Sequence, residues 1–261
     1  MLWKGHSKEQ NQMHEATSRI LAGAATHVGN VRQRNEDSYL VATHRGLWAV
    51  ADGMGGHDAG DVASRVVVEE LNAIPTPATA ADLLASCEKR MLVANSRLRQ
   101  LADERGAVIG TTIAILLVFN RSYACVWSGD SRIYRIRGEA IEQVSIDHTE
   151  IQELVLDGKI STEEAATWPH RNAVTRAIGV FEHPELEIKS GLLEAGDGFV
   201  ICSDGLTAHV SNEEILDLAG KNTAQAACDL LLQLTLDRGA SDNVTLVIVQ
   251  FGSASANSAK E

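Results

Sequence analysis

Several aspartates in this sequence lie where an apolar run begins or ends, and their side chains could act together. Asp52, Asp130 and Asp204 each stand next to a glycine, and Asp37 and Asp242 lie beside other turns. A carboxylate at a strand end is partly exposed, and a neighbouring glycine lets backbone carbonyls approach a bound ion. If these carboxylates converged they would repel one another, so we expect a cation to neutralise them.

Oxygen ligands favour the hard divalent ions Mg²⁺ and Mn²⁺. The sequence contains no His/Cys grouping with zinc spacing, which disfavours zinc. Taken singly, each of these aspartates is more simply a turn residue, because Asp-Gly is a common turn signal. The metal hypothesis therefore depends on the elements that position the aspartates and on the residues around them.

Short runs rich in β-branched residues predict strands, and four of these strands begin or end near an aspartate. The predicted strands span residues 47–51, 111–119, 122–128, 133–136, 198–202 and 243–251. The dipeptide Asn120-Arg121 separates two of them and is typical of a hairpin. Four of the aspartates are therefore expected at the ends of strands.

Apolar residues at intervals of three and four predict long helices at about 58–74, 80–104 and 223–236. The stripe along the second helix includes Cys87 and Met91, which we interpret as core residues rather than ligands. Strands and helices are grouped rather than strictly alternating, which disfavours a doubly wound parallel sheet. We expect an α+β fold of layered antiparallel sheets with helices packed outside.

The polar segment from Asp147 to about Ile178 has too little apolar content for a core element. We expect it to form a flap over the surface beside the site. Residues 1–22 are predicted to be a poorly ordered extension and residues 253–261 a disordered tail. One domain remains, at residues 23–252.

The overall composition excludes several classes of protein. The 261 residues carry a net charge of −12, which argues against general affinity for nucleic acid or anionic membranes. No apolar run approaches the roughly 20 residues of a membrane span, and the first residues lack the apolar region of a signal peptide. Four cysteines lie far apart without a C-x-x-C pair, which is typical of a reduced, cytoplasmic protein.

Six motifs surround the aspartates, at residues 29–37 (GNVRQRNED), 52–57 (DGMGGH), 129–132 (GDSR), 172–179 (NAVTRAIG), 202–206 (CSDGL) and 241–245 (SDNVT). In this order and spacing they resemble the metal-dependent protein phosphatases, the PP2C-like serine/threonine phosphatases, in their bacterial form. The resemblance covers about residues 26–251. It implies a four-layer α/β/β/α sandwich of two antiparallel sheets flanked by helices.

The resemblance also implies metal ligands. Asp52 is similar to the carboxylate that bridges two metal ions, and the carbonyl of Gly53 to a ligand of one of them. Asp204 and Asp242 are similar to ligands of the other ion. A third, weaker metal would be shared between Asp130 and Asp204.

Further positions follow from the same resemblance. Glu36 or Asp37 would lie near the first ion, directly or through water. Arg32 matches the phosphate-binding arginine of the family, and Asn243 would orient the last motif. All the positions expected to contact metal or phosphate are therefore filled, which favours an active enzyme.

The implied reaction is hydrolysis of phosphoserine and phosphothreonine by a water held between two Mn²⁺ or Mg²⁺ ions. Two metals and one guanidinium supply the positive charge that a phosphate monoester needs around its oxygens. The general acid is either His57 or a water on the third metal, because relatives outside bacteria place a histidine where this chain has Met54.

The implied partners are phosphorylated proteins and a cognate bacterial Ser/Thr kinase, with the chain acting in signalling as a monomer. Two alternatives remain at this stage. One is a pseudophosphatase that keeps the fold as a binding module without catalysis, and the other is a phosphatase for a small molecule or an anti-sigma-factor antagonist.

Overall fold

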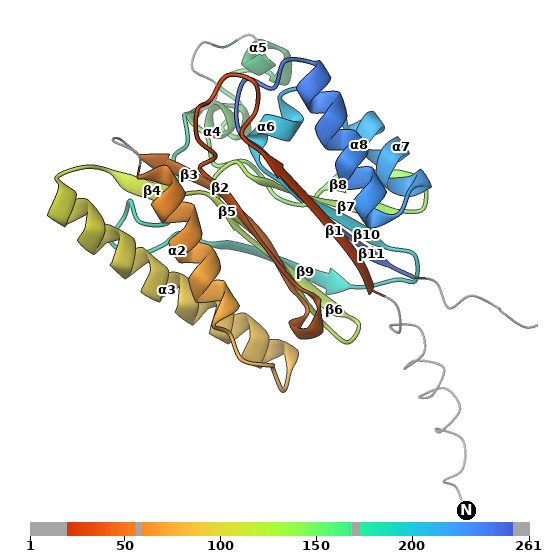
Figure 1. Cartoon of the computed structure of the whole chain (residues 1–261), viewed down its shortest axis with the longest axis horizontal. Helices are drawn as coiled ribbons and strands as arrows, with labels where there is room; N and C mark the ends of the chain where they lie inside the picture. The colour runs from red at the N-terminus through yellow and green to blue at the C-terminus, as the bar shows by residue number, and fades with distance from the viewer. Residues whose placement is uncertain (1–19, 56–58, 167, 169–172, 253–261) are drawn as a thin grey trace, which may run out of the picture.

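The computed structural model describes residues 20–55, 59–166, 168 and 173–252. Two antiparallel sheets pack face to face at its centre, and helices cover both outer faces (Figure 1). The first sheet has the order β1-β11-β10-β7-β8, with strands at Ile20–His27, Val244–Phe251, Gly198–Cys202, Arg132–Arg137 and Ala140–Gln143. The predicted α+β sandwich is therefore confirmed.

The second sheet has the order β2-β3-β5-β6-β9, with strands at Asp37–Ala42, Leu47–Gly55, Ile113–Phe119, Ser122–Ser128 and Glu187–Leu192. A short strand, β4 at Ile109–Thr111, pairs with the end of β3, and a 3-10 helix, η1 at Thr43–Arg45, joins β2 to β3. The β5–β6 hairpin turns at Asn120-Arg121 as predicted, with Asn120 at a φ of +54°.

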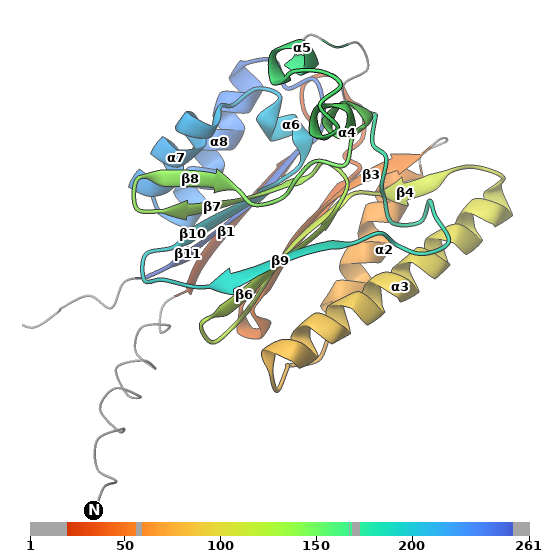
Figure 2. The same cartoon turned by 180° about the vertical axis from the view of Figure 1, so that it is seen from behind.

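Helices α2 (Gly60–Asn72) and α3 (Ala80–Arg105) cover the second sheet. The first sheet is covered by α6 (Asp204–Thr207), α7 (Asn212–Lys221) and α8 (Ala224–Asp237), on the opposite side of the molecule (Figure 2). Cys87 and Met91 of α3 are fully buried, which confirms their interpretation as core residues. No helix among the described residues is long and apolar enough to span a membrane.

Aromatic side chains fill the space between the sheets. The rings of Trp48 and Phe199 both meet Phe251 edge to face, at centroid distances of 6.3 and 6.0 Å. This inner layer and the two layers under the helices together hold most of the buried apolar side chains. Packing on both faces of both sheets fixes the strand ends that carry the candidate site.

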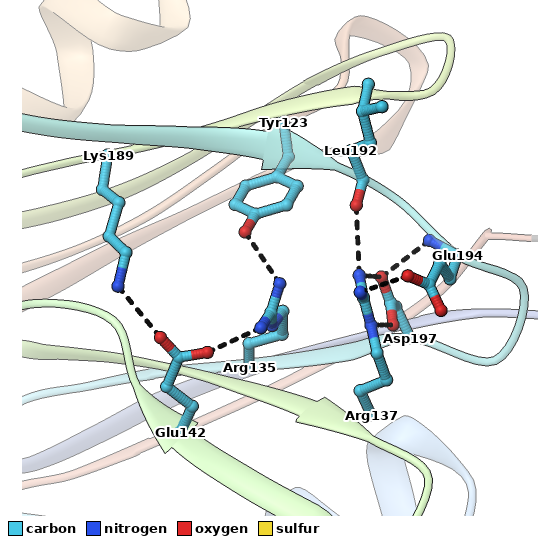
Figure 3. Close-up of polar contacts among 8 residues, drawn as sticks. All are labelled: Tyr123, Arg135, Arg137, Glu142, Lys189, Leu192, Glu194 and Asp197. Atoms are coloured by element: carbon cyan, nitrogen blue, oxygen red, sulfur yellow. Dashed lines mark hydrogen bonds and ion pairs between the residues drawn. The ribbon is translucent and has the colours of Figure 1, made fainter.

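Polar side chains join the two sheets near the edge formed by β8 and β9 (Figure 3). Arg137 binds the carboxylate of Asp197 through two nitrogens, each 2.7 Å from an oxygen, and also pairs with Glu194. The Asp197 side chain is fully buried, and its carboxylate also accepts the amide of Glu194. Nearby, the carboxylate of Glu142 in β8 accepts hydrogen bonds from Arg135 of β7 and Lys189 of β9, which links these two strands.

The domain begins earlier than predicted. β1 starts at Ile20 rather than at residue 23, because Ile20, Leu21 and Ala22 pair with the last strand, β11. Residues 1–19 and 253–261, which include the rest of the predicted extension and tail, lie outside the described residues.

The predicted flap lies beside the two sheets and carries two short helices, α4 (Glu150–Leu156) and α5 (Thr162–Ala166) (Figure 1). No residue of α4 is fully buried, in agreement with the low apolar content of this segment. Within the flap, residues 167 and 169–172 are outside the described part of the chain.

Candidate metal centre

Asp37 and Asp52 lie directly opposite each other on neighbouring antiparallel strands, so their side chains share one face. Asp52 does not end its strand as predicted. β3 continues to Gly55, because β4 pairs with its last residues. The carbonyl of Asp52 accepts the hydroxyl of Thr111 and the amide of Thr112, each at 2.8 Å, which fixes the backbone under the carboxylate.

The carboxylate of Asp37 is buried and only half satisfied. Its Oδ2 accepts the hydroxyl of Ser203 at 2.9 Å, whereas Oδ1 has no hydrogen-bond partner. A buried carboxylate oxygen without a donor costs free energy, which a bound cation would recover.

Gly60 leaves room for the carboxylate of Glu36 and the carbonyl oxygen of Gly53. A Cβ at Gly60, the first residue of α2, would lie 2.7 Å from Cδ of Glu36 and 2.8 Å from the carbonyl oxygen of Gly53. The amide of Gly53 donates to the Glu36 carbonyl at 3.1 Å, so the two residues are also linked through their backbones. A larger residue at position 60 would therefore displace the Glu36 carboxylate or the Gly53 carbonyl.

The last motif fastens the loop before β2. Asn243 accepts the amide of Glu36 at 2.8 Å and donates to the carbonyls of Val28 and Arg34 at 2.9 and 2.8 Å. Its own amide donates to Oδ1 of the adjacent Asp242 at 2.8 Å. Asn243 thus orients both the loop and the neighbouring carboxylate.

Arg32 extends from the same loop. Its Nη2 donates to Oδ2 of Asp242 at 2.7 Å, and this hydrogen bond raises the pKa of the guanidinium. The Arg32 side chain is 55% exposed, so it faces solvent at the margin of the carboxylate group.

Two further aspartates lie towards the flap. Asp130 lies in the turn between β6 and β7, and Asp204 begins α6 two residues after the end of β10. Both line a cavity of about 320 Å³ whose other walls include residues of α4, α5 and α6. Arg132 stands in the same cavity and is neutralised by Asp147, with Nε and Nη2 at 3.0 and 2.7 Å from its two oxygens.

Four carboxyl groups, two of them buried and two partly buried, raise one another's pKa values. Burial, and then the charges of the neighbouring carboxylates, raises the pKa of Asp37 to about 6 and that of Asp130 to about 7. The same causes raise the pKa of Asp204 and raise that of Asp52 well above its ordinary value. The structure therefore brings these residues within electrostatic reach of one another.

The donor set fits a divalent cation. The unpartnered oxygen of Asp37, the close approach at Gly60 and the mutual repulsion of the carboxylates each favour positive charge at this place. Among the described residues, no three His, Cys, Asp or Glu side chains are already gathered as a closed ligand group. His57 lies outside the described residues, so its position relative to the carboxylates is not part of this geometry.

Sequence reasoning missed several residues that shape the centre. Ser203 lies within the motif at 202–206, and its hydroxyl could have been noticed as a donor to a neighbouring carboxylate. Gly60 and Thr112 carry no signal of this kind in the sequence, since the contacts of each depend on strands or helices brought together by the fold.

The same fold occurs in solved serine/threonine phosphatases, and the chain belongs to the protein phosphatase 2C family. It matches Protein phosphatase 2C over residues 26–235, a range that includes five of the six motifs, and this confirms the family resemblance.

Individual relatives support this assignment. The chain is 36% identical over 223 residues to serine/threonine protein phosphatase PstP of Mycobacterium tuberculosis, covering 84% of this chain but 43% of PstP. It therefore spans less than half the length of that relative. Protein phosphatase PhpP of Streptococcus pneumoniae is 32% identical over 239 residues, which cover 88% of this chain and 97% of PhpP.

Solved structures agree closely. PppA of Pseudomonas aeruginosa, described as a key regulatory component of the T6SS, is 38% identical with a TM-score of 0.83, covering 90% of this chain and 99% of that chain. The catalytic domain of PstP in complex with two manganese ions is 34% identical with a TM-score of 0.79, at the same coverage of 90% and 99%.

Proposed function

We propose that this chain is a metal-dependent phosphatase that hydrolyses phosphoserine and phosphothreonine in proteins. The observation that carries the proposal is the facing pair of carboxylates, Asp37 and Asp52, in which one oxygen of the buried Asp37 has no donor. Membership of the protein phosphatase 2C family supports it. The proposed partners are phosphorylated proteins and a cognate bacterial Ser/Thr kinase.

The proposed metals are two Mn²⁺ or Mg²⁺ ions, with a third, weaker ion. Asp52 would hold both of the first two ions, and the Gly53 carbonyl would hold one of them together with Glu36 or Asp37, directly or through water. Asp204 and Asp242 would hold the other ion, and Asp130 would share the third with Asp204. When bound, these ions activate water for attack on phosphorus and offset the charge of the phosphate.

The chain's own residues would bind and orient the substrate. Arg32 is exposed enough to reach a phosphate, and its ion pair with Asp242 holds the guanidinium beside the carboxylates. Asn243 keeps the Arg32 loop fastened to β11 while the substrate enters.

The direct test is hydrolysis of p-nitrophenyl phosphate and of a phosphothreonine peptide with and without Mn²⁺. We expect turnover of both substrates that depends on Mn²⁺ and is lost with EDTA. A folded protein that binds no metal and turns over neither substrate would instead be a pseudophosphatase, and the proposal would fail.

We expect Arg32→Ala to raise KM for the phosphopeptide about tenfold with a smaller change in kcat, because a contact to a charged group contributes roughly 1.5–3 kcal/mol. Steady-state kinetics at saturating Mn²⁺ measure this. Arg99→Ala, which removes an exposed arginine from α3, is the matched control for the loss of one positive charge. A fall in kcat at constant KM would assign Arg32 a different role.

His57→Ala tests the general acid. If His57 donates the proton to the leaving serine or threonine, the variant is expected to lose the basic limb of the pH profile of kcat. The effect should be smaller with p-nitrophenyl phosphate, since p-nitrophenolate leaves without needing a proton. An unchanged pH profile with the phosphopeptide would exclude His57 as the acid.

A further inference from the structure

Two segments leave the sandwich side by side to form the neck of the flap, defined here as residues 148–150 and 173–176. The amide of Glu150 donates to the carbonyl of Ala173 at 3.0 Å, and the amide of Thr175 donates to the carbonyl of His148 at 2.9 Å. Between these two hydrogen bonds, Thr149 and Val174 form an antiparallel bridge. The flap helices α4 and α5 are therefore attached to the sandwich through a paired, ladder-like neck.

A single carboxylate oxygen binds both sides of this neck. Oε1 of Glu187, the first residue of β9, lies 3.2 Å from Nε2 of His148 and 2.9 Å from Nη1 of Arg176. The His148 side chain is only 5% exposed and stacks on Trp127, with ring centroids 6.2 Å apart. Trp127 is also the residue paired with Glu187 across β6 and β9. The anchor of the neck is thus part of the sheet.

The same histidine holds the turn that carries Asp130. The amide of Gly129 donates to Nδ1 of His148 at 3.1 Å, and the amide of His148 donates to the Gly129 carbonyl at 3.0 Å. A backbone amide can only donate, so Nδ1 is the acceptor and the ring proton resides on Nε2, directed at Glu187. Nη1 of Arg176 lies 3.4 Å from Nε2 of His148. Both nitrogens are donors, and they share Oε1 of Glu187 as their acceptor.

The turn itself has little freedom. Gly129 has a φ of +107°, and a Cβ there would lie 2.6 Å from the side chain of Thr112. The Thr112 hydroxyl is in turn 2.7 Å from that of Ser131, the residue after Asp130. With contacts on both sides of Asp130, a shift of His148 would be passed to this carboxylate.

We propose that His148 and Glu187 are positioning residues that lock the flap neck to the Gly129-Asp130 turn, so that the placement of the flap and the orientation of Asp130 are coupled. We call His148 and Glu187 together the clamp. The clamp contacts neither substrate nor the Asp130 carboxylate. It acts through two hydrogen bonds between His148 and Gly129 and through the contacts of Glu187 with His148 and Arg176. Its catalytic consequence rests on the proposed function, because Asp130 matters to turnover only if it contributes to a metal site.

Amide hydrogen exchange tests the clamp without any activity measurement. Glu187→Ala removes the shared acceptor, and His148→Phe keeps a ring on Trp127 but removes both nitrogen contacts. In each variant we expect the amides of Glu150 and Thr175 to exchange at least about tenfold faster, with no change in the core strand β5. Glu185→Ala is the matched control, because it removes an exposed partner of Arg176 at 3.2 Å and leaves the clamp intact. Glu187→Gln, which retains an acceptor oxygen, should restore slow exchange.

A second measurement tests the coupling to Asp130. We expect Glu187→Ala and His148→Phe to raise the Mn²⁺ concentration for half-maximal hydrolysis of p-nitrophenyl phosphate severalfold, with KM for the substrate unchanged. Unchanged neck exchange in His148→Phe would overturn the clamp, even if Glu187→Ala failed to fold. Faster neck exchange with an unchanged Mn²⁺ dependence would overturn the coupling. If the wild-type chain lacks activity, the proposed function fails, but the exchange measurement still decides the clamp.

Discussion

Asp52→Asn is expected to reduce turnover at least about 1,000-fold while the chain remains folded. Asp52 would contact both of the first two ions, and metal stabilisation of a transition state contributes several kcal/mol, each 1.4 kcal/mol being about tenfold in rate. Asparagine has nearly the same shape and keeps the backbone bonds from Thr111 and Thr112 to residue 52. Kinetics with p-nitrophenyl phosphate at saturating Mn²⁺ measure the loss.

The stability of the same variant provides an independent check. Because burial and the neighbouring carboxylates both disfavour the charged form of Asp52, removing its charge should leave the Tm of the metal-free protein equal or higher. Asp61→Asn is the control, since Asp61 is an aspartate of α2 that pairs with Arg65 near the surface. Near-normal turnover by Asp52→Asn would refute its role as the shared ligand.

The metal-free protein is expected to lose stability as the pH rises from about 4 to about 7. Asp37 and Asp130 have pKa values of about 6 and about 7 in the fold, above the 3.8 of an ordinary aspartate. The folded state therefore binds protons more tightly than the unfolded state, and its advantage disappears as these groups ionise. A shift of two pKa units corresponds to about 3 kcal/mol, or roughly 6–10 °C in Tm for a domain of this size.

Thermal unfolding in EDTA between pH 5 and pH 8 measures this effect. Mn²⁺ should reverse it, because metal binds the ionised carboxylates, and the stabilisation by Mn²⁺ should fade towards pH 5 as protons compete for the same oxygens. Asp130→Asn should show a shallower pH dependence than the wild type without metal. A Tm that rises steadily from pH 5 to pH 8 in EDTA would contradict the prediction.

Local sequence pattern was sufficient for the elements that are strongly apolar. The strands at 113–119, 198–202 and 244–251 were predicted almost to the residue, since burial on both faces leaves continuous apolar runs. The helix at 80–105 was predicted equally well, since its buried face places apolar residues at intervals of three and four. β1 escaped prediction because its small residues carry weak strand propensity, and its pairing with β11 joins opposite ends of the chain. β9 escaped because it is an edge strand with a mostly exposed, polar sequence.

The candidate site shows the same division. The aspartates were found because each lies within a local motif, and four of the five respond to one another as buried groups in the fold. The place of Asp52 within a longer strand was not foreseen, because β4 reaches it from more than 50 residues away. The clamp was likewise invisible, since Glu187 belongs to no motif and meets His148 only after β9 has paired with β6.

The polar network around Arg137 and Asp197 holds the two sheets together whether or not metal is bound. Arg132 and Arg137 lie at opposite ends of β7, about 17 Å apart, so the network fastens the sheets at the end remote from the carboxylates. One end of the sandwich relies on ions that the surroundings supply or withdraw, and the other on charges encoded in the chain. The contacts between the sheets at the remote end therefore do not depend on metal, and we expect the chain to bind its ions as a folded receptor rather than as an unstructured chelator.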